Sequence, residues 1–299
     1  MRHRLPADVL LLLTVLFWSL NFTAVKYALD HGFSPLVYSS VRFGAAAVIF
    51  AGFTHVREGS LAVSRRDAWI LVGAAGSGIW LNQMGFVYAV DLTSSVATVA
   101  LCFGTLPIFV ALIASAFGVE RLRARHWVAT GISFAGVALV AAGSSGKISG
   151  DLGGILLALA TAATWAGYSV AIGPLMRRYS PYKISAVVLL AGCVPLFATA
   201  SVQLAHEGWG AITGLAWAAC IYSFFFALVV TNVLWFTAIE RVGAARSALY
   251  ANLQPFLGAL FALAILSESL SWTQVVGGAI IGAGILVARR AQAPGAVVD

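Results

Sequence analysis

Ten apolar stretches, each about as long as a membrane-crossing helix, constrain the fold of this chain more than any other feature. A bilayer core of ~30 Å requires about 20 apolar residues in a helix. The runs are continuous, whereas strands of a membrane barrel alternate. The sequence therefore predicts an all-α membrane protein with ten transmembrane helices. The stretches lie near residues 7–29, 36–54, 68–90, 94–117, 126–142, 152–175, 184–205, 212–238, 247–266 and 271–288.

The positions of the basic residues predict the orientation of these helices. Cytoplasmic loops of membrane proteins carry an excess of Lys and Arg. With the N-terminus inside, fifteen of the 18 basic residues fall in cytoplasmic segments. The outer loops hold only Lys147, while Lys26 and Arg42 lie within spans. We therefore expect a multi-pass protein of the cell inner (plasma) membrane with both termini cytoplasmic.

The two halves of the sequence resemble each other. Without gaps, residues 99–140 match residues 247–288 at thirteen of 42 positions, including Pro107/Pro255 and Glu120/Glu268. Ala and Leu identities carry little weight in apolar segments, so the Pro and Glu pairs are the informative ones. With small changes in spacing, further pairs are Trp18 with Trp165, Gln83 with Asn232, Asp91 with Glu240, and Ser34-Pro35 with Ser180-Pro181.

A repeat of five helices must be inverted in the membrane, because five is an odd number. We predict a first five-helix repeat over residues 1–143, an inverted second one over 150–290, and a cytoplasmic tail over 291–299 of one integral membrane domain. The glycine- and serine-rich segment 143–150 is predicted to be the loop between them. Inverted repeats are typical of secondary transporters, whose halves exchange roles across the membrane.

Several motifs carry a resemblance to a known family. They are Trp18, Asn21, Pro35, Arg42-Phe43, Pro107, Glu120, Gly131 and Gly136, and then Pro255, Glu268, Gly278 and Gly284 in the second half. Over nearly its whole length the chain resembles the drug/metabolite transporter superfamily, in its ten-helix form with duplicated domains. It looks closest to the bacterial exporters of aromatic amino acids. In two respects the chain differs from the family's patterns: the second half lacks a counterpart of Arg42, and the first helix lacks the glutamate of the small multidrug members. Proton-coupled export of cationic drugs is therefore disfavoured.

Aromatic and uncharged polar residues at membrane depth are the candidates for a substrate site. Indole rings offer flat apolar surfaces for stacking, and an amide in hydrocarbon must either bond to another helix or face a wet cavity. We expect Trp18 and Trp165, as repeat mates, to wall a cavity, with ordinary helix packing as the alternative. The predicted substrate-binding residues are Trp18, Asn21, Tyr38, Asn82, Gln83, Trp165, Tyr168, Asn232, Trp235, Tyr250, Asn252 and Gln254.

Arg42, Pro107 and Pro255 are predicted to serve in gating or in the structure. A buried Arg costs about 3 kcal/mol on insertion scales, so Arg42 should pair with carbonyls or solvent, or contact a substrate carboxylate. Pro255 closely follows Asn252 and Gln254, and its ring removes a helix hydrogen bond. A broken segment of this kind can offer backbone groups to a ligand.

The titratable residues argue against other classes of function. All eleven acidic residues and all five histidines lie at helix ends, interfaces or in loops, which disfavours an intramembrane enzyme, a proton site at depth or a sodium site. The sequence has no metal-ligand grouping and no GxxxxGK[ST] loop, so we expect neither metal nor cofactor. The basic residues form no stripe for nucleic acid, and the expected partners are a small-molecule substrate and the lipid bilayer, with the chain as a monomer.

The sequence therefore predicts a secondary transporter that exports or facilitates the passage of neutral amphiphilic metabolites. Amino acids, including aromatic ones, are the expected substrates, and alternating access is the expected mechanism. A carrier of phosphorylated or nucleotide sugars is the alternative within transport, but such anions favour paired cations at depth. A channel is disfavoured because it needs rings of repeated polar side chains.

Overall fold

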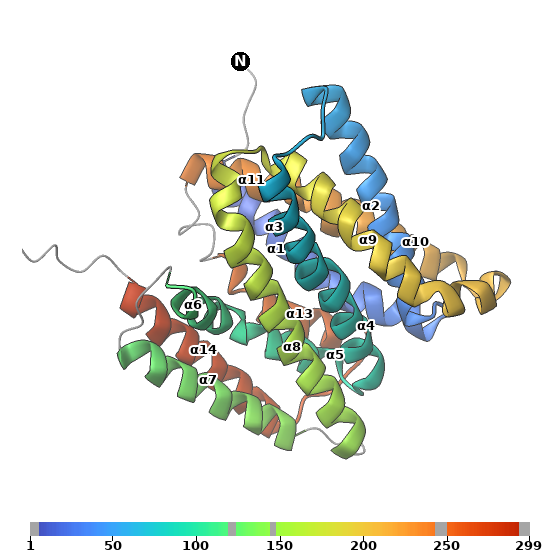
Figure 1. Ribbon diagram of the computed structural model, residues 1–299. Helices are drawn as coiled ribbons and strands as arrows, with labels where there is room; N and C mark the ends of the chain where they lie inside the picture. Colours follow the sequence, from blue (N-terminus) through green and yellow to red (C-terminus); the bar gives the residue numbers. More distant parts are fainter. Residues whose placement is uncertain (1–5, 119–123, 144–147, 243–249, 293–299) are drawn as a thin grey trace, which may run out of the picture.

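The computed structural model describes residues 6–118, 124–143, 148–242 and 250–292, and every regular element in these segments is a helix (Figure 1). The α-helices are α1 (Ala7–Asp30), α2 (Pro35–Glu58), α3 (Arg65–Ala75), α4 (Asn82–Leu92), α5 (Val96–Cys102), α6 (Leu106–Ala116), α7 (Ala124–Ala142), α8 (Ile148–Ile172), α9 (Pro181–His206), α10 (Gly214–Phe224), α11 (Thr231–Val242), α13 (Gln254–Ile265) and α14 (Trp272–Gln292). Two π-helical segments are η1 (Gly76–Leu81) and η5 (Phe225–Val230), and short 3-10 turns are η2 (Phe103–Thr105), η3 (Gly173–Arg177) and η4 (Trp209–Ala211). The predicted all-α fold is confirmed for these residues.

Among the described residues, seven helical segments are long and apolar enough to cross a membrane. They are Ala7–Asp30, Pro35–Glu58, Arg65–Leu92, Val96–Ala116, Leu152–Met176, Pro181–His206 and Gly214–Trp235. Three shorter apolar helices, Trp127–Val140, Gln254–Ile265 and Trp272–Val287, lie at the three remaining predicted stretches. Helices suit this environment because they satisfy their own backbone polar groups where no water is present. One boundary differs from the prediction: α8 begins at Ile148, inside the segment 143–150 that was expected to be a loop.

The third and eighth predicted helices are interrupted at the same place in the two halves. α3, η1 and α4 follow one another without a gap, and so do α10, η5 and α11. The π-helical segments begin at Gly76 and Phe225, a spacing of 149 residues. This is also the spacing of the predicted repeat mates Gln83 and Asn232. Because π-helical turns are rare and occur frequently at functional sites, the match indicates that both halves use this feature.

The fourth and ninth predicted helices are also broken at matching positions. The turn η2 separates α5 from α6, which begins at Leu106. A turn at residues 252–253 precedes α13, which begins at Gln254, 148 residues after Leu106. Pro107 and Pro255 lie in the first turn of the new helix, where the N–H that proline lacks would have no partner inside the helix. The structure thus contains the break that the sequence predicts before Pro255.

The second helices of the two halves, α2 and α9, pack against each other in an antiparallel arrangement. The Ser180 hydroxyl at the start of α9 donates a hydrogen bond to the Glu58 carboxylate at the end of α2. At the other end of the pair, the backbone N–H of Ser34 donates to Glu207 Oε1 over 3.0 Å. Each helix end is therefore tied to the start of its partner by an acidic side chain.

The fifth and tenth predicted helices, α7 and α14, form a second close pair, side by side in Figure 1. A Cβ atom on Gly136 would lie 2.7 Å from the backbone oxygen of Gly277, and one on Gly277 would lie 2.6 Å from the backbone oxygen of Gly136. Small residues let helices approach this closely in membranes, where van der Waals packing drives their association. Both positions therefore require glycine for this crossing.

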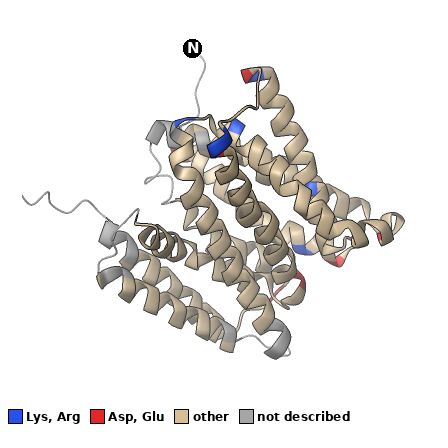
Figure 2. Cartoon of the chain, in the orientation of Figure 1, with Lys and Arg blue, Asp and Glu red and all other residues tan. Residues whose placement is uncertain are grey.

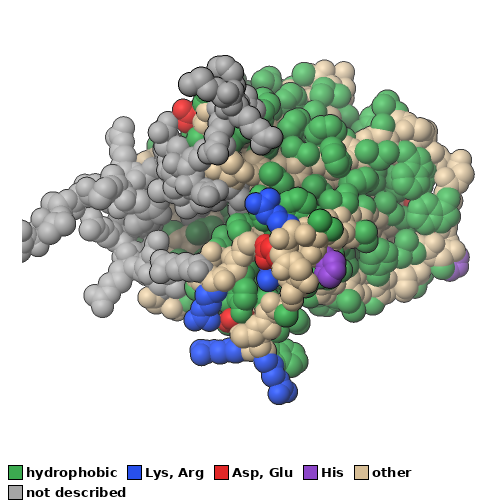
Figure 3. All heavy atoms as spheres, turned by 90° about the horizontal axis from the view of Figure 1, so that it is seen from above, with side chains coloured by type: hydrophobic (Ala, Val, Ile, Leu, Met, Phe, Trp, Pro, Cys, Tyr) green, Lys and Arg blue, Asp and Glu red, His purple; other side chains and the backbone are tan. Residues whose placement is uncertain are grey.

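Charged residues lie mainly near helix ends in the part of the chain that the structure describes, and few lie between those ends (Figure 2). Where α2 ends and α9 begins, Lys183 pairs with Glu58 at 3.3 Å. At the far end of α1, Lys26 pairs with Asp30 at 3.0 Å. Seen from above, basic side chains gather beside a broad hydrophobic surface, as expected where a protein leaves the bilayer (Figure 3).

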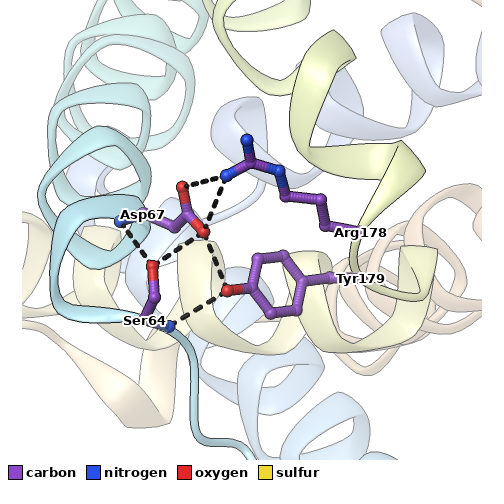
Figure 4. A network of polar contacts seen from close by, with 4 residues as sticks. All are labelled: Ser64, Asp67, Arg178 and Tyr179. Carbon is purple, nitrogen blue, oxygen red and sulfur yellow. Dashed lines mark hydrogen bonds and ion pairs between the residues drawn. The ribbon is translucent and has the colours of Figure 1, made fainter.

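One polar network joins the two halves at the basic end of the molecule. The Asp67 carboxylate accepts hydrogen bonds from the hydroxyls of Ser64 and Tyr179, both at 2.8 Å. Arg178 Nη1 lies 3.2 Å from Asp67 Oδ1, and the Ser64 backbone N–H donates to the Tyr179 hydroxyl over 3.0 Å. Figure 4 shows that these groups link the start of α3 to the segment before α9.

Candidate substrate site

The first helix, α1, meets the interrupted helix of the second half along one face. Trp18 Nε1 donates a hydrogen bond to Thr231 Oγ1 over 3.0 Å, and its ring centroid lies 5.1 Å from that of Trp235. About one turn later in α1, Asn21 Oδ1 accepts a hydrogen bond from the Ser223 hydroxyl. Asn21 is buried, whereas Trp18 and Trp235 are half-buried. The structure thus brings three of the predicted site residues together.

Further aromatic rings line the same contact between α1 and the interrupted helix. The Phe17 ring centroid lies 5.5 Å from that of Phe226, and the Phe17 carbonyl accepts a hydrogen bond from the Tyr222 hydroxyl over 2.9 Å. The rings of Tyr222 and Phe226 are stacked, with centroids 5.8 Å apart. Offset aromatic rings of this kind provide a flat apolar surface with few polar groups.

A corresponding contact forms between α8, the first helix of the second half, and the interrupted helix of the first half. Asn82 follows the π-helical segment η1 as Thr231 follows η5. Asn82 Nδ2 donates to the carbonyl of Thr161 over 2.9 Å and to Thr164 Oγ1 over 3.3 Å. Gln83 Nε2 donates to Asn82 Oδ1 over 2.9 Å, and Gln83 Oε1 is buried with no partner in the described structure. The Asn82 amide thus bonds two helices together, while Gln83 keeps a free acceptor.

Trp165 and Tyr168 form the aromatic pair at this second contact. The two residues are three positions apart on one face of α8, and their ring centroids lie 5.0 Å apart. Gly78 in η1 makes room for them, because a side chain there would overlap the Tyr168 ring. Trp165 therefore packs on the ring that faces η1, whereas Trp18 itself bonds to the interrupted helix of the other half.

The other predicted site residues of the second half make different contacts. The Tyr250 hydroxyl donates to Asp8 Oδ1 over 2.9 Å at the start of α1. Asp8 precedes Trp18 by ten residues, which is about 15 Å along a helix. The Gln254 carbonyl accepts a hydrogen bond from Ser19 Oγ over 3.2 Å, so the broken segment before Pro255 does offer a backbone acceptor to α1. Asn232 and Asn252 are half-buried.

The three residues predicted to act in gating or structure have different surroundings. Pro255 is buried at the start of α13, and the side-chain surroundings of Pro107 lie outside the described structure. Arg42 is 6% exposed, and its guanidinium carbon lies 5.1 Å from the centroid of the Phe43 ring. Its Nε atom is buried without a hydrogen-bond partner. The pairing expected from the sequence is therefore not provided by the described residues.

Hydroxyl groups were missed as members of the site. Ser223 and Thr231 bond to Asn21 and Trp18, yet a Ser or Thr in an apolar helix commonly bonds to its own backbone. Thr161 does so as well, donating to the Leu157 carbonyl over 2.7 Å. The signal that could have found Thr231 is its position, 149 residues after Asn82 in the repeat.

Glu268 caps the N-terminus of α5. Its carboxylate accepts hydrogen bonds from Ser95 Oγ at 2.9 Å and from the backbone N–H groups of Val96 at 2.8 Å and Ala97 at 3.1 Å. A carboxylate at a helix N-terminus is stabilised by the unpaired N–H groups and the helix dipole. The repeat mate, Glu120, lies outside the described residues.

The described residues contain no group of three or more His, Cys, Asp or Glu side chains that could hold a metal ion. The polar groups gathered at the two contacts are amides, hydroxyls and indole N–H groups, which bind by hydrogen bonding.

Comparisons with known proteins agree with this picture. Residues 5–142 and 152–290 each match the model of the EamA-like transporter family. A protein of Archaeoglobus fulgidus named an uncharacterized transporter is 27% identical, covering 94% of this chain and 98% of its own. YedA of Escherichia coli K12, named an uncharacterized inner membrane transporter, is 25% identical over 96% of this chain and 92% of its own.

A third relative carries a more specific name. A protein of Streptantibioticus cattleyicolor, named a probable terminal-alkyne amino-acid exporter, is 25% identical over 94% of this chain and 92% of its own. A crystal structure of a protein 20% identical to this chain matches it with a TM-score of 0.65, covering 97% of this chain and 99% of that one. The structural match shows that the fold is shared.

Proposed function

Because this chain belongs to the EamA-like transporter family, and its relatives are named as transporters, we propose that it is a secondary transporter of neutral amphiphilic metabolites, in particular amino acids, including aromatic ones. It moves them out across the cell inner membrane by alternating access. The ten predicted helices form two inverted five-helix repeats, residues 1–143 and 150–290, with both termini and the tail 291–299 in the cytoplasm. The chain works as a monomer in the bilayer.

The observation that carries this proposal is the pair of corresponding contacts. In each, a polar side chain bonds the interrupted helix of one half to the first helix of the other half, and that first helix carries a tryptophan, Trp18 or Trp165. Alternating access requires two similar arrangements that can exchange roles about a central substrate. Interrupted helices at the same repeat positions supply that equivalence.

The character of the side chains supports the substrate class. The Trp18–Trp235 and Trp165–Tyr168 pairs offer flat apolar surfaces. A sugar phosphate is less well matched, because a doubly charged group favours two cations and Arg42 is the sole buried Lys or Arg among the side chains that the structure describes. The relative named an amino-acid exporter supports amino acids.

Counterflow in proteoliposomes tests the proposal. Vesicles loaded with unlabelled phenylalanine should accumulate labelled phenylalanine from outside, because a carrier exchanges substrate across the membrane. We expect exchange with phenylalanine and other neutral amino acids, no exchange with glucose 6-phosphate, and persistence of exchange after a protonophore is added. Exchange with the sugar phosphate alone would contradict the amino-acid assignment. Flux without counterflow would contradict a carrier.

Labelling of single cysteines tests the proposed topology separately. A cysteine at position 147 should react with an impermeant maleimide added outside the cell, and one at the exposed position Ser60 should react only from the cytoplasmic side. Reaction of both positions from one side would exclude the inverted arrangement of the halves.

A further inference from the structure

Arg42 is a buried cation that the described protein leaves unpaired. It lies in α2, seven residues after Pro35, or about 10 Å into the helix. The residue is 6% exposed, its Nε atom has no hydrogen-bond partner, and no described acidic side chain forms an ion pair with it. A buried charge without a partner strongly opposes folding unless something compensates for it. The guanidinium therefore lacks an anion.

The groups around Arg42 are neutral: the Phe43 ring, whose centroid lies 5.1 Å from the guanidinium carbon, and three side chains that can form hydrogen bonds. Tyr38 lies one turn earlier on α2 and is fully buried, and its hydroxyl lies beside that of Ser223 without the geometry of a hydrogen bond, because Ser223 donates to Asn21 instead. From α10, Tyr222 and Cys220 lie within electrostatic reach of the guanidinium. None of these three side chains supplies a negative charge at neutral pH. A second unpaired donor thus accompanies the unpaired cation on the same face of α2.

The second half provides an internal control for this position. α2 and α9 both begin with Ser-Pro, so Tyr38 and Arg42 correspond to Ile184 and Val188. Ile184 is 1% exposed and Val188 is fully buried. The fold therefore accommodates aliphatic side chains at the equivalent places. Replacing buried charged groups by apolar ones is often neutral or stabilising, so packing gives no reason for the polar pair.

We propose that Arg42 and Tyr38 form a subsite for the carboxylate of the transported molecule. This inference rests on the proposed function and specifies its substrates as apolar or aromatic carboxylic acids, including α-amino acids. A guanidinium binds a carboxylate through two parallel N–H groups, and the Tyr38 hydroxyl adds a third donor. One buried cation matches one negative charge, which favours a carboxylate over a phosphate.

The position of the subsite agrees with the aromatic contact beside it. Tyr38 lies beside Ser223, whose hydroxyl bonds to Asn21 on α1. Tyr222, which lies near Arg42, bonds to the carbonyl of Phe17, the residue before Trp18. A substrate carboxylate at Arg42 thus leaves the rest of the molecule on the side of the Tyr222, Phe17 and Phe226 rings. Only one half carries this subsite, so the substrate binds in one orientation.

Isothermal titration of the purified full chain in detergent tests the subsite, with ligands that differ at one group. Phenylalanine and 3-phenylpropionate carry the carboxylate, and phenylalaninamide lacks it. Because a hydrogen bond to a charged group is worth more than a neutral one, wild-type protein should bind the two acids about 10- to 150-fold more tightly than the amide. In Arg42→Gln this preference should fall to within about threefold, with the affinity for the amide unchanged.

Two further variants separate recognition from folding. Arg42→Val installs the residue of the equivalent position in α9, so its unfolding temperature should match or exceed that of wild type while the preference for acids is lost. Tyr38→Phe removes one hydroxyl and should weaken binding of the acids about 2- to 12-fold. Lys26→Gln is the control, because Lys26 is already paired with Asp30, and it should keep the full preference.

Each outcome bears on one of the two proposals. If Arg42→Gln weakens the acids and the amide equally, Arg42 is structural and the subsite is wrong, while amino-acid transport still stands. If wild type binds 3-phenylpropionate but not phenylalanine, the subsite stands and the amino-acid substrate is wrong. If wild type does not prefer the acids to the amide, the subsite is wrong. Tighter binding of glucose 6-phosphate, lost in Arg42→Gln, would replace the carboxylate by a phosphate.

Discussion

α2 and α9 are equivalent helices that differ where the difference matters for binding. Both begin with Ser-Pro, both are tied at their ends by an acid of the partner, and both are buried along their common contact. Within this shared frame α2 carries Tyr38 and Arg42, and α9 carries Ile184 and Val188. The helix ends and the contact between the helices are therefore common to both repeats, whereas the polar pair Tyr38 and Arg42 occurs in the first repeat alone.

The interrupted helices show the opposite behaviour. Asn82 and Thr231 differ in chemistry, yet each follows a π-helical segment and each bonds to the first helix of the other half. Here both copies keep a polar group at the equivalent place. We infer that the polar groups after the π-helical segments occur in both halves because the two halves exchange roles. The pair Tyr38 and Arg42 occurs in one half because it recognises one end of an asymmetric substrate.

The largest expected loss of stability concerns the crossing of α7 and α14, where equivalent helices of the two halves meet. We expect Gly136→Val and Gly277→Val each to destabilise the protein by about 3 kcal/mol, at the upper end of the usual cost of overpacking. The reason is that a new Cβ would lie 2.7 or 2.6 Å from a backbone oxygen, which cannot rotate away. Thermal unfolding and the monodisperse fraction on size-exclusion chromatography measure the loss.

Gly131→Val is the matched control on α7, because no atom lies within 4 Å of a Cβ placed there. It should change stability by no more than about 0.5 kcal/mol, as surface substitutions usually do. Normal behaviour of Gly136→Val would show that the crossing is wrong. Tolerance of Gly277→Val alone would show that the two helices do not contribute equally.

A smaller effect should distinguish the two ends of the α2–α9 pair. Glu58 accepts a hydrogen bond from Ser180 and pairs with Lys183 at 3.3 Å, whereas Glu207 holds the Ser34 N–H with one oxygen and leaves the other buried without a partner. We expect Glu58→Gln to cost about 1.5 kcal/mol, the lower range for hydrogen bonds to charged groups. Glu207→Gln should cost about 0.5 kcal/mol or less, because it also removes an uncompensated buried charge.

Thermal unfolding in detergent measures both changes, with Asp30→Asn as the control. Asp30 pairs with Lys26, but its side chain is 47% exposed, and exposed pairs contribute little to stability. An equal loss at Glu58 and Glu207 would show that the ends of the pair are equivalent. A larger loss at Glu207 would contradict the contacts described for its two oxygens.

Much of the fold was predictable because long apolar runs in the sequence determine where the helices lie. Residues 7–29 and 36–54 became α1 and α2 with ends shifted by a few residues, since hydrophobic length sets the span. The matched π-helical segments were not predictable, because GSGIWL is rich in Gly and Ser whereas FFALVV is a plain apolar run, so the two share no sequence pattern. They depend on packing against other helices.

The site was predictable in part, for a related reason. Tryptophans in mid-span and amides in apolar surroundings are visible in the sequence, so Trp18, Asn21 and Trp235 could be named before their contacts were known. Which donors remain unpaired depends on the arrangement of neighbouring helices. The isolation of Arg42 could therefore be seen only in the structure.

The two tryptophans allow a test of function that compares the two aromatic contacts. Trp18→Ala and Trp165→Ala should each weaken phenylalanine transport about 2- to 12-fold, because an aromatic pair contributes about 0.5 to 1.5 kcal/mol beyond its buried area. Exchange of alanine, which has no ring to stack, should change less at equal expression. Loss of both substrates together with folded protein would mean that the residues only pack helices.

Replacing each tryptophan by phenylalanine then tests whether the two aromatic contacts differ. Trp18→Phe keeps a ring but loses the hydrogen bond from Nε1 to Thr231, whereas the described structure gives the Trp165 indole no hydrogen bond to lose. Trp18→Phe should therefore reduce phenylalanine exchange by a few fold, about the value of one neutral hydrogen bond, and Trp165→Phe should leave it nearly unchanged. Thr231→Val should reproduce the effect of Trp18→Phe, and the double variant should add nothing further, because both changes remove the same bond. Equal effects of the two Phe variants would mean that the contacts in the two halves are more alike than this structure shows.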